Sequence, residues 1–159
     1  MNKSELNYAL ETVVSVAEEV GRLMIRNVNR VKVVDESKQH DVKLALDKQS
    51  QHLIETRLQK IFPQIPVLGE EGTRGDLDSE LRWIVDPIDG TVNYFHGIPH
   101  ACVSIVLQQK PKEKTGLEYE DGYRTIIGVI YDPFTDEMWT ATAGGKTRVN
   151  GRIVAVSGR

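Results

Sequence analysis

The chain has 159 residues, with 20 Lys and Arg against 23 Asp and Glu, so its formal net charge is -3. This length suits one globular domain with a sizeable core. No stretch approaches the roughly 18 apolar residues that a membrane-spanning helix needs, and the N-terminus does not resemble a signal peptide. The mild acidity argues against a nucleic-acid-binding domain, which normally has a concentrated basic surface. We therefore expect a cytoplasmic protein that binds neither membranes nor nucleic acid.

Two helices are expected in the first third of the chain. From Ser4 to about Val28, apolar residues recur at spacings of three and four, which indicates an amphipathic helix with Ser4 as its N-cap. A β-branched run and then a polar stretch occupy residues 31–40. A second helix is expected to begin near Asp47 and to end before Pro63.

Short apolar runs, bounded by Gly, Pro and Asp, follow Pro66 and predict strands. These runs are residues 67–68, 83–85, 101–107, 125–131, 138–141 and 153–156. Asn150-Gly151 predicts a type I′ hairpin turn, and the polar residues 108–122 predict a loop between two antiparallel strands. Helices first and strands afterwards predict an α+β fold with a mostly antiparallel sheet.

Two further residue types give structural expectations. Trp83 and Trp139 are expected in the core. The single cysteine, Cys102, excludes an internal disulfide framework and a multi-cysteine zinc site. Because it lies within an apolar strand, Cys102 is expected to be a small core residue without a reactive role.

Carboxylates gather directly after two of the predicted strands. Glu70 and Glu71 follow one short apolar run, and Asp86 and Asp89 follow the next. If these strands are neighbours, the carboxylates meet in one place, where they repel one another unless a cation neutralises them. The available ligands are oxygen atoms, without clustered His or Cys, so the sequence favours Mg²⁺ over Zn²⁺.

The segment that begins at Asp86 has a further implication. Pro87 fixes φ and is expected to reverse the chain, so that Asp86 and Asp89 point into one cavity with the Ile88 carbonyl between them. Gly90 lets the backbone approach a ligand closely, and the N–H groups that follow it are expected to open a short helical turn that binds an anion. A metal site beside an anion site predicts metal-assisted transfer of a phosphoryl group to water.

These residues resemble the inositol monophosphatase family. The resemblance rests on Gly69-Glu70-Glu71-Gly72 and the run Trp83–Tyr94, and it continues through His96-Gly97-Ile98-Pro99 and Val103-Ser104-Ile105. It covers nearly the whole chain. It implies the N-terminal α+β part of the family's αβαβα sandwich, with two antiparallel helices packed on the sheet. It also implies Mg²⁺-dependent hydrolysis of a small phosphate monoester, with inositol monophosphate placed first.

The resemblance assigns a role to each site residue. The metal ligands that it implies all supply oxygen atoms: Glu70, Asp86, the Ile88 carbonyl and Asp89, with Glu71 close by and acting through water. Thr91, paired with Asp47, would orient and deprotonate the attacking water, a task that Glu70 would share. Asp89 and the backbone N–H groups of Gly90 and Thr91 would bind the substrate, a small phosphorylated polyol or sugar. No covalent phosphoenzyme is expected.

Structural interpretations of the same residues stay open. Asp-Pro and Asp-Gly pairs are common in turns, and adjacent glutamates are common in solvated loops. Asp47 could serve equally as a helix N-cap. Its placement also rests on a segment in which Val42-Lys43-Leu44 stands where the family commonly has a Val-Thr pair.

The family runs longer than this chain and carries a further metal-binding aspartate in a Trp-Asp motif, to which nothing here corresponds. Residues 1–159 are therefore expected to be the N-terminal metal-binding part of a longer domain whose C-terminal part is absent. Two alternatives remain: a truncated, non-catalytic metal-binding or dimerising module, and a family member acting on another sugar phosphate such as fructose bisphosphate, on histidinol phosphate or on a 3′-phosphoadenosine nucleotide. The resemblance also allows a homodimer.

Overall fold

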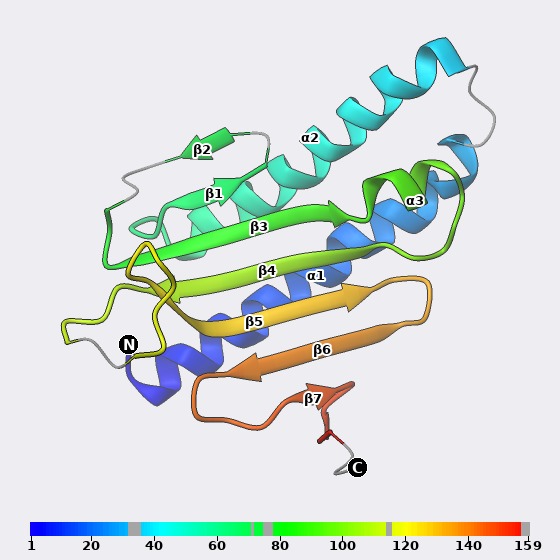
Figure 1. Ribbon diagram of the computed structural model, residues 1–159. Coiled ribbons are helices and arrows are strands. Elements are labelled where there is room, and N and C mark those ends of the chain that lie inside the picture. Colours follow the sequence, from blue (N-terminus) through cyan, green and yellow to red (C-terminus); the bar gives the residue numbers. More distant parts are fainter. Residues whose placement is uncertain (32–35, 71, 75–77, 114–115, 157–159) are drawn as a thin grey trace.

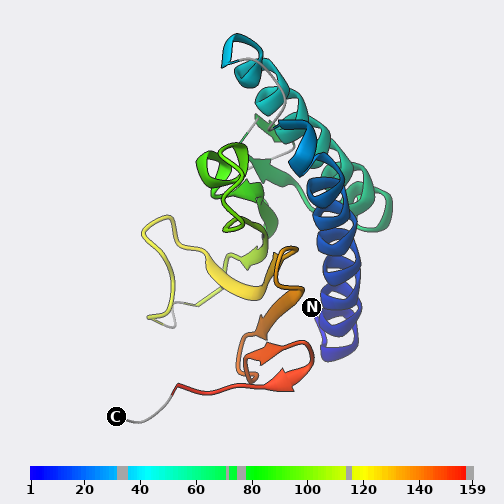
Figure 2. The ribbon, with the colours of Figure 1, turned by 90° about the vertical axis from the view of Figure 1, so that its right-hand side faces the viewer.

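The computed structural model describes residues 1–31, 36–70, 72–74, 78–113 and 116–156 (Figure 1). The two long helices, α1 (Lys3–Val31) and α2 (Glu36–Ile61), run antiparallel to each other and lie on one face of a single sheet (Figure 2). This arrangement confirms the predicted α+β class. Within these ranges, none of the helices combines the length and apolar character that crossing a bilayer requires.

The beginning of α1 differs from the expectation. The side-chain oxygen of Asn2 accepts a hydrogen bond from the Glu5 N–H at 2.9 Å, and the Glu5 carboxylate accepts one from the Asn2 N–H at 2.8 Å. This reciprocal pair satisfies the free N–H groups of the first turn, so the prediction of Ser4 as N-cap is wrong. The apolar stripe is confirmed, because Val13 and Val20 are fully buried.

The second helix begins much earlier than the sequence suggested. α2 starts at Glu36, so the start near Asp47 is wrong, and Asp47 lies inside the helix, where it cannot be the N-cap. The polar stretch was interpreted as a break because it lacks apolar periodicity. Straight-chain polar residues such as Glu, Lys and Gln are nevertheless good helix formers, and neither Gly nor Pro occurs between Gly21 and Pro63.

The sheet has eight strands in the order β2-β1-β3-β4-β5-β6-β7-β8. In chain order they are β1 (Val67–Gly69), β2 (Gly72–Arg74), β3 (Leu81–Asp89), β4 (Cys102–Gln109), β5 (Arg124–Asp132), β6 (Glu137–Thr142), β7 (Arg148–Val149) and β8 (Arg152–Ile153). Every pairing in the described sheet is antiparallel except that of β1 with β3. The mostly antiparallel sheet is thereby confirmed.

The hairpin between β7 and β8 also agrees with the prediction. Asn150 and Gly151 both have positive φ, 48° and 77°, as a type I′ turn requires. β8 is shorter than the apolar run 153–156 suggested, because it ends at Ile153.

The two faces of the sheet have different surroundings. On the face that packs against α1 and α2, Trp83, Ile105 and Leu107 are fully buried. The opposite face carries Ile130 and Trp139, whose exposed fractions are 45% and 40%. The prediction that Trp139 belongs to the core is therefore wrong, whereas Trp83 confirms it.

Candidate active site

The C-terminal ends of β1 and β3 lie side by side. The two strands pair in parallel with Gly69 opposite Val85, and Glu70 and Asp86 are the next residues on each strand. Gly69 lies so close to α2 that a side chain at this position would collide with Gln51. The expectation that the two strands preceding the acidic motifs are neighbours is confirmed.

Asp86 is half-buried and surrounded by negative charge. Burial raises the pKa of Asp86 above its ordinary value, and the charges of Asp89 and Glu70 raise it further. A hydrogen bond of 3.2 Å from the Ile88 N–H to Asp86 Oδ1 acts on the pKa in the opposite direction. The charges of Asp89 and Glu70 thus oppose the ionisation of Asp86, a repulsion that a cation would relieve.

The strand β3 continues through Pro87 as far as Asp89. Its register with β4 shifts on the way: Asp86 lies opposite Ser104, and Asp89 lies opposite Cys102, so β3 has one residue more than β4 here. The predicted chain reversal at Pro87 is wrong, because the chain forms a β-bulge instead. A bulge leaves one residue unpaired and therefore tolerates a proline, which has no N–H to donate.

Gly90 precedes the short helix α3 (Thr91–Phe95), as predicted. Its φ of 85° lies in the left-handed region, and a Cβ added there would lie 2.8 Å from the carbonyl oxygen of His100. Only glycine avoids both penalties. The Thr91 hydroxyl donates a hydrogen bond of 2.8 Å to the Ile88 carbonyl, which ties the first turn of α3 to the end of β3.

Asp47 approaches α3 from α2. Asp47 is only 9% exposed, and together with burial, which contributes more, its charge raises the pKa of the Tyr94 phenol to about 12. Tyr94 is fully buried, and its hydroxyl donates a hydrogen bond of 2.6 Å to the Met24 carbonyl of α1. These contacts link α1, α2 and α3. The pairing of Asp47 with Thr91 stays a prediction.

Tyr94→Phe is expected to lower the free energy of unfolding by about 1 kcal/mol, because it removes one buried hydrogen bond and keeps the ring. Urea denaturation measures this difference. The matched control is Tyr8→Phe, since the Tyr8 side chain is 55% exposed, and it should change stability by only a few tenths of that amount. Equal effects of the two substitutions would contradict a structural role for the Tyr94 hydroxyl.

Of the two predicted glutamate ligands, the structure describes only Glu70. Glu70 is exposed, and Glu71 lies outside the described residues. In the part of the chain that the structure describes, no group of three or more His, Cys, Asp or Glu side chains is placed to hold a metal ion. The donor chemistry nevertheless fits a hard cation, since Asp86, Asp89 and Glu70 supply carboxylate oxygens whose mutual repulsion raises the pKa of Asp86.

A cavity of about 370 Å³ opens beside Asp89. Asp132, Glu137 and Trp139 line it from β5 and β6, and the Trp139 indole N–H donates a hydrogen bond of 3.2 Å to Glu137. No sequence pattern places these three residues beside Asp89, because they follow it by more than forty positions. The order of the strands in the sheet would have placed them beside Asp89, but a short sequence motif does not determine that order.

Cys102 also lines this cavity and is half-buried, so the expectation that it belongs to the core is wrong. Its thiol donates a hydrogen bond of 3.8 Å to Asp89. Burial and then the charges of Asp89, Asp86 and Asp132 raise the pKa of the Cys102 thiol to about 11. In the absence of metal the thiol therefore stays protonated at neutral pH. That Cys102 has no reactive role stays a prediction.

Helices on one face of a mostly antiparallel sheet, and carboxylates that follow the ends of two parallel strands, define an α+β protein with acidic residues gathered at one edge of the sheet. The sequence matches the model of the inositol monophosphatase family over residues 5–159, and the chain belongs to this family.

Three relatives illustrate the match. An inositol monophosphatase of Dictyostelium discoideum is 33% identical over 162 residues, which cover 99% of this chain and 55% of the relative. The Nus factor SuhB of Pseudomonas aeruginosa is 34% identical over 159 residues, covering 97% of this chain and 53% of the relative. The solved inositol monophosphatase of Anabaena superposes with a TM-score of 0.76 at 31% identity, covering 98% and 52%. The chain thus spans about half the length of the relatives that it matches.

Proposed function

We propose that this protein hydrolyses a small phosphate monoester in a Mg²⁺-dependent reaction, with inositol monophosphate as its substrate. The observation that carries the proposal is the parallel pairing of β1 with β3, which places Glu70 and Asp86 directly after adjacent strand ends. Burial and then the charges of Asp89 and Glu70 raise the pKa of Asp86. The adjoining turn at Gly90 supports the proposal, because no described side chain caps the N-terminus of α3 by a hydrogen bond. Membership of the inositol monophosphatase family supports a phosphatase.

In this proposal the cation is held by oxygen atoms only. The residues are Glu70, Asp86 and Asp89 through their carboxylates and Ile88 through its carbonyl, with Glu71 acting through water. When bound, Mg²⁺ supplies a Lewis acid that favours water as a nucleophile and stabilises the departing oxygen.

The chain's own residues bind the substrate and handle the proton. Backbone N–H groups of Gly90 and Thr91 bind the phosphate. In the structure the Thr91 hydroxyl donates its hydrogen bond to the Ile88 carbonyl. In the proposed reaction it turns to donate to the Asp47 carboxylate instead, and its lone pairs accept a hydrogen bond from the attacking water. Glu70, which is exposed, accepts the proton of that water. The water oxygen bonds to phosphorus, the ester P–O bond breaks, and the departing alkoxide takes a proton from solvent water, to which Glu70 returns the proton that it accepted.

A second candidate is a metal-binding or dimerising module without turnover. It is favoured by the fact that the chain spans about half of each relative, 55% of the one from Dictyostelium and 53% of the one from Pseudomonas. The name of the latter, Nus factor SuhB, also refers to a role other than hydrolysis.

Phosphate release from inositol 1-phosphate by this chain, with and without Mg²⁺, tests the proposal. Release that depends on Mg²⁺ supports the phosphatase and excludes the inert module. If this chain is inactive and an extended version carrying the downstream coding sequence is active, residues 1–159 are the N-terminal metal-binding part of the phosphatase. The preferred substrate is tested by comparing inositol 1-phosphate with fructose bisphosphate, histidinol phosphate and a 3′-phosphoadenosine nucleotide. If neither version releases phosphate from any of these esters, the phosphatase proposal is contradicted.

A further inference from the structure

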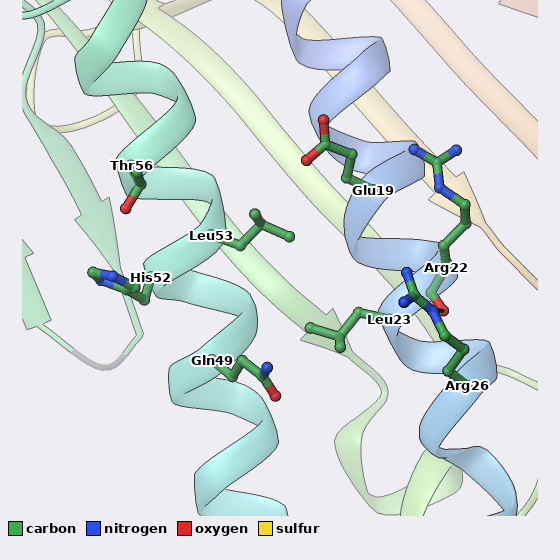
Figure 3. A pocket seen from close by; sticks show the side chains of 8 residues that line it. All are labelled: Glu19, Arg22, Leu23, Arg26, Gln49, His52, Leu53 and Thr56. Atoms are coloured by element: carbon green, nitrogen blue, oxygen red, sulfur yellow. Dashed lines mark hydrogen bonds between the residues drawn. The ribbon is translucent and has the colours of Figure 1, made fainter.

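A second cavity, of about 540 Å³, lies between α1 and α2 and shares no lining residue with the cavity beside Asp89 (Figure 3). Each helix contributes four residues at positions i, i+3, i+4 and i+7, a spacing that places side chains on one face of a helix. The set from α1 is Glu19, Arg22, Leu23 and Arg26, and the set from α2 is Gln49, His52, Leu53 and Thr56.

The wall formed by α1 carries two arginines, of which Arg22 is weakly paired and Arg26 is not paired with any described residue. Arg26 lies one turn after Arg22, and its Nε donates a hydrogen bond of 3.2 Å to the Arg22 carbonyl. Arg26 makes no ion pair with any described residue. Arg22 contacts Glu18 at 3.6 Å, and the two side chains are 56% and 46% exposed, so this pair is weak.

The acidic residue of the cavity does not cancel this charge. The Glu19 carboxylate is bound by two nitrogens of Arg57, at 2.8 and 3.0 Å. Its negative charge is therefore already paired by a residue outside the cavity. Arg26 of the α1 wall is therefore available to an anion, and Arg22 becomes available if it gives up its weak, exposed pair with Glu18.

The opposite wall offers neutral hydrogen-bonding groups. Gln49, His52 and Thr56 are exposed, and none of the three side chains is hydrogen-bonded to another residue in the described ranges. Between the walls Leu23 and Leu53 point toward each other (Figure 3), and both pack against the core. The cavity thus has a cationic wall, an apolar floor and a neutral polar wall.

The dimensions of this cavity favour a small molecule over a peptide helix. Its volume of about 540 Å³ lies within the roughly 300–1,000 Å³ that is usual for small-molecule sites. Seven residues of a helix extend about 10 Å, and two turns of an incoming helix, about 10 Å in diameter, would fill about 800 Å³.

The chemistry of the cationic wall favours a phosphate. One guanidinium can satisfy both oxygens of a carboxylate, whereas two guanidiniums on neighbouring turns suit the larger number of oxygens on a phosphate. We propose that the cavity between α1 and α2 is a second binding site, for a small organic phosphate, separate from the site at Asp86 and Asp89. The phosphate binds Arg22 and Arg26, and the body of the molecule lies on the leucine floor.

The test is an NMR titration of this chain with phenyl phosphate in Mg²⁺-free buffer. The expected result is a saturable shift of the Leu23 and Leu53 methyl resonances and of the His52 ring resonances. Arg26→Gln should weaken the affinity about tenfold or more, because one charge-assisted contact is lost. Asp89→Asn should leave the titration unchanged, which separates this site from the candidate active site.

Arg152→Gln is the matched control, because it makes the same change of charge at an exposed residue of β8. Three results would overturn the proposal. The first is the absence of shifts at the leucines and His52. The second is equal weakening by Arg152→Gln and Arg26→Gln, which would mean attraction by net charge alone. The third is equal binding of benzoate and phenyl phosphate, which would mean that the site does not select phosphate.

Discussion

Asp86→Asn is expected to make the metal-free protein more stable while removing Mg²⁺-dependent phosphate release. The folded state raises the pKa of Asp86 above its ordinary value of 3.8, through burial and then the charges of Asp89 and Glu70. A raised pKa means that folding disfavours the ionised carboxylate. The stability that Asp86 contributes is therefore fully present below pH 3.8 and is lost as pH rises through the raised pKa.

Asparagine cannot ionise, so the stability of the variant should fall less between acidic and neutral pH in the absence of metal. With Mg²⁺ the order reverses. If Asp86 is a ligand as proposed, the wild-type chain should gain stability from the cation. Asp86→Asn should gain little, because a neutral amide replaces one carboxylate ligand. The expected loss of Mg²⁺-dependent turnover, measured in whichever form of the protein is active, is at least about 100-fold.

Thermal unfolding across this pH range, with and without Mg²⁺, measures both effects. The control is Asp78→Asn, because the Asp78 side chain is 88% exposed beside Lys110, and it should behave as the wild type does. If Asp86→Asn instead lowers metal-free stability and keeps the Mg²⁺ response, Asp86 is a structural residue of the bulge and not a ligand.

Gly90→Ala is expected to destabilise the protein by about 3 kcal/mol and to abolish the phosphate binding that we propose for this turn. Two physical terms contribute. A non-glycine residue in the left-handed region costs about 1–2 kcal/mol, and φ of Gly90 is 85°. The added Cβ would also lie 2.8 Å from the His100 carbonyl oxygen, so the backbone on one side must move.

Gly122→Ala separates these terms. Gly122 has a φ of 82°, almost that of Gly90, but no atom lies within 4 Å of an added Cβ. Its substitution should therefore cost only the conformational part, about 1–2 kcal/mol. Urea denaturation measures the free energy of unfolding of both variants. Equal decreases would show that the segment around His100 moves away from the added Cβ without an energetic cost.

The fold was predictable wherever a local pattern determined it. The apolar stripe of α1, the strand around Trp83 and the turn at Asn150-Gly151 each follow from periodicity or from turn chemistry. The start of α2 was not predictable in this way, because polar residues from Glu36 onward suit a helix and a loop alike.

The residues of the candidate site, too, were predictable only where a local pattern placed them. Glu70 and Asp86 could be placed together from their positions after two strands, once those strands were taken as neighbours. Trp139 and Glu137 could not be placed beside Asp89, since their position depends on the pairing of β4 with β5 and of β5 with β6. Such long-range pairing has no signature in a short window of sequence.

The bulge in β3 changes the face of the sheet on which the side chains that follow it lie. Side chains along a regular strand alternate between its faces, so counting on from the buried Trp83 and Val85 would put Asp89 on the helix-covered face as well. The extra residue changes the phase by one step, and Asp89 emerges exposed, opposite Cys102, two positions along β4 from the partner of Asp86. Two aspartates at an odd interval thereby share one face. Without the extra residue, the Asp89 carboxylate would lie in the hydrophobic core. With it, the carboxylate lies on the exposed face, where a ligand can reach it.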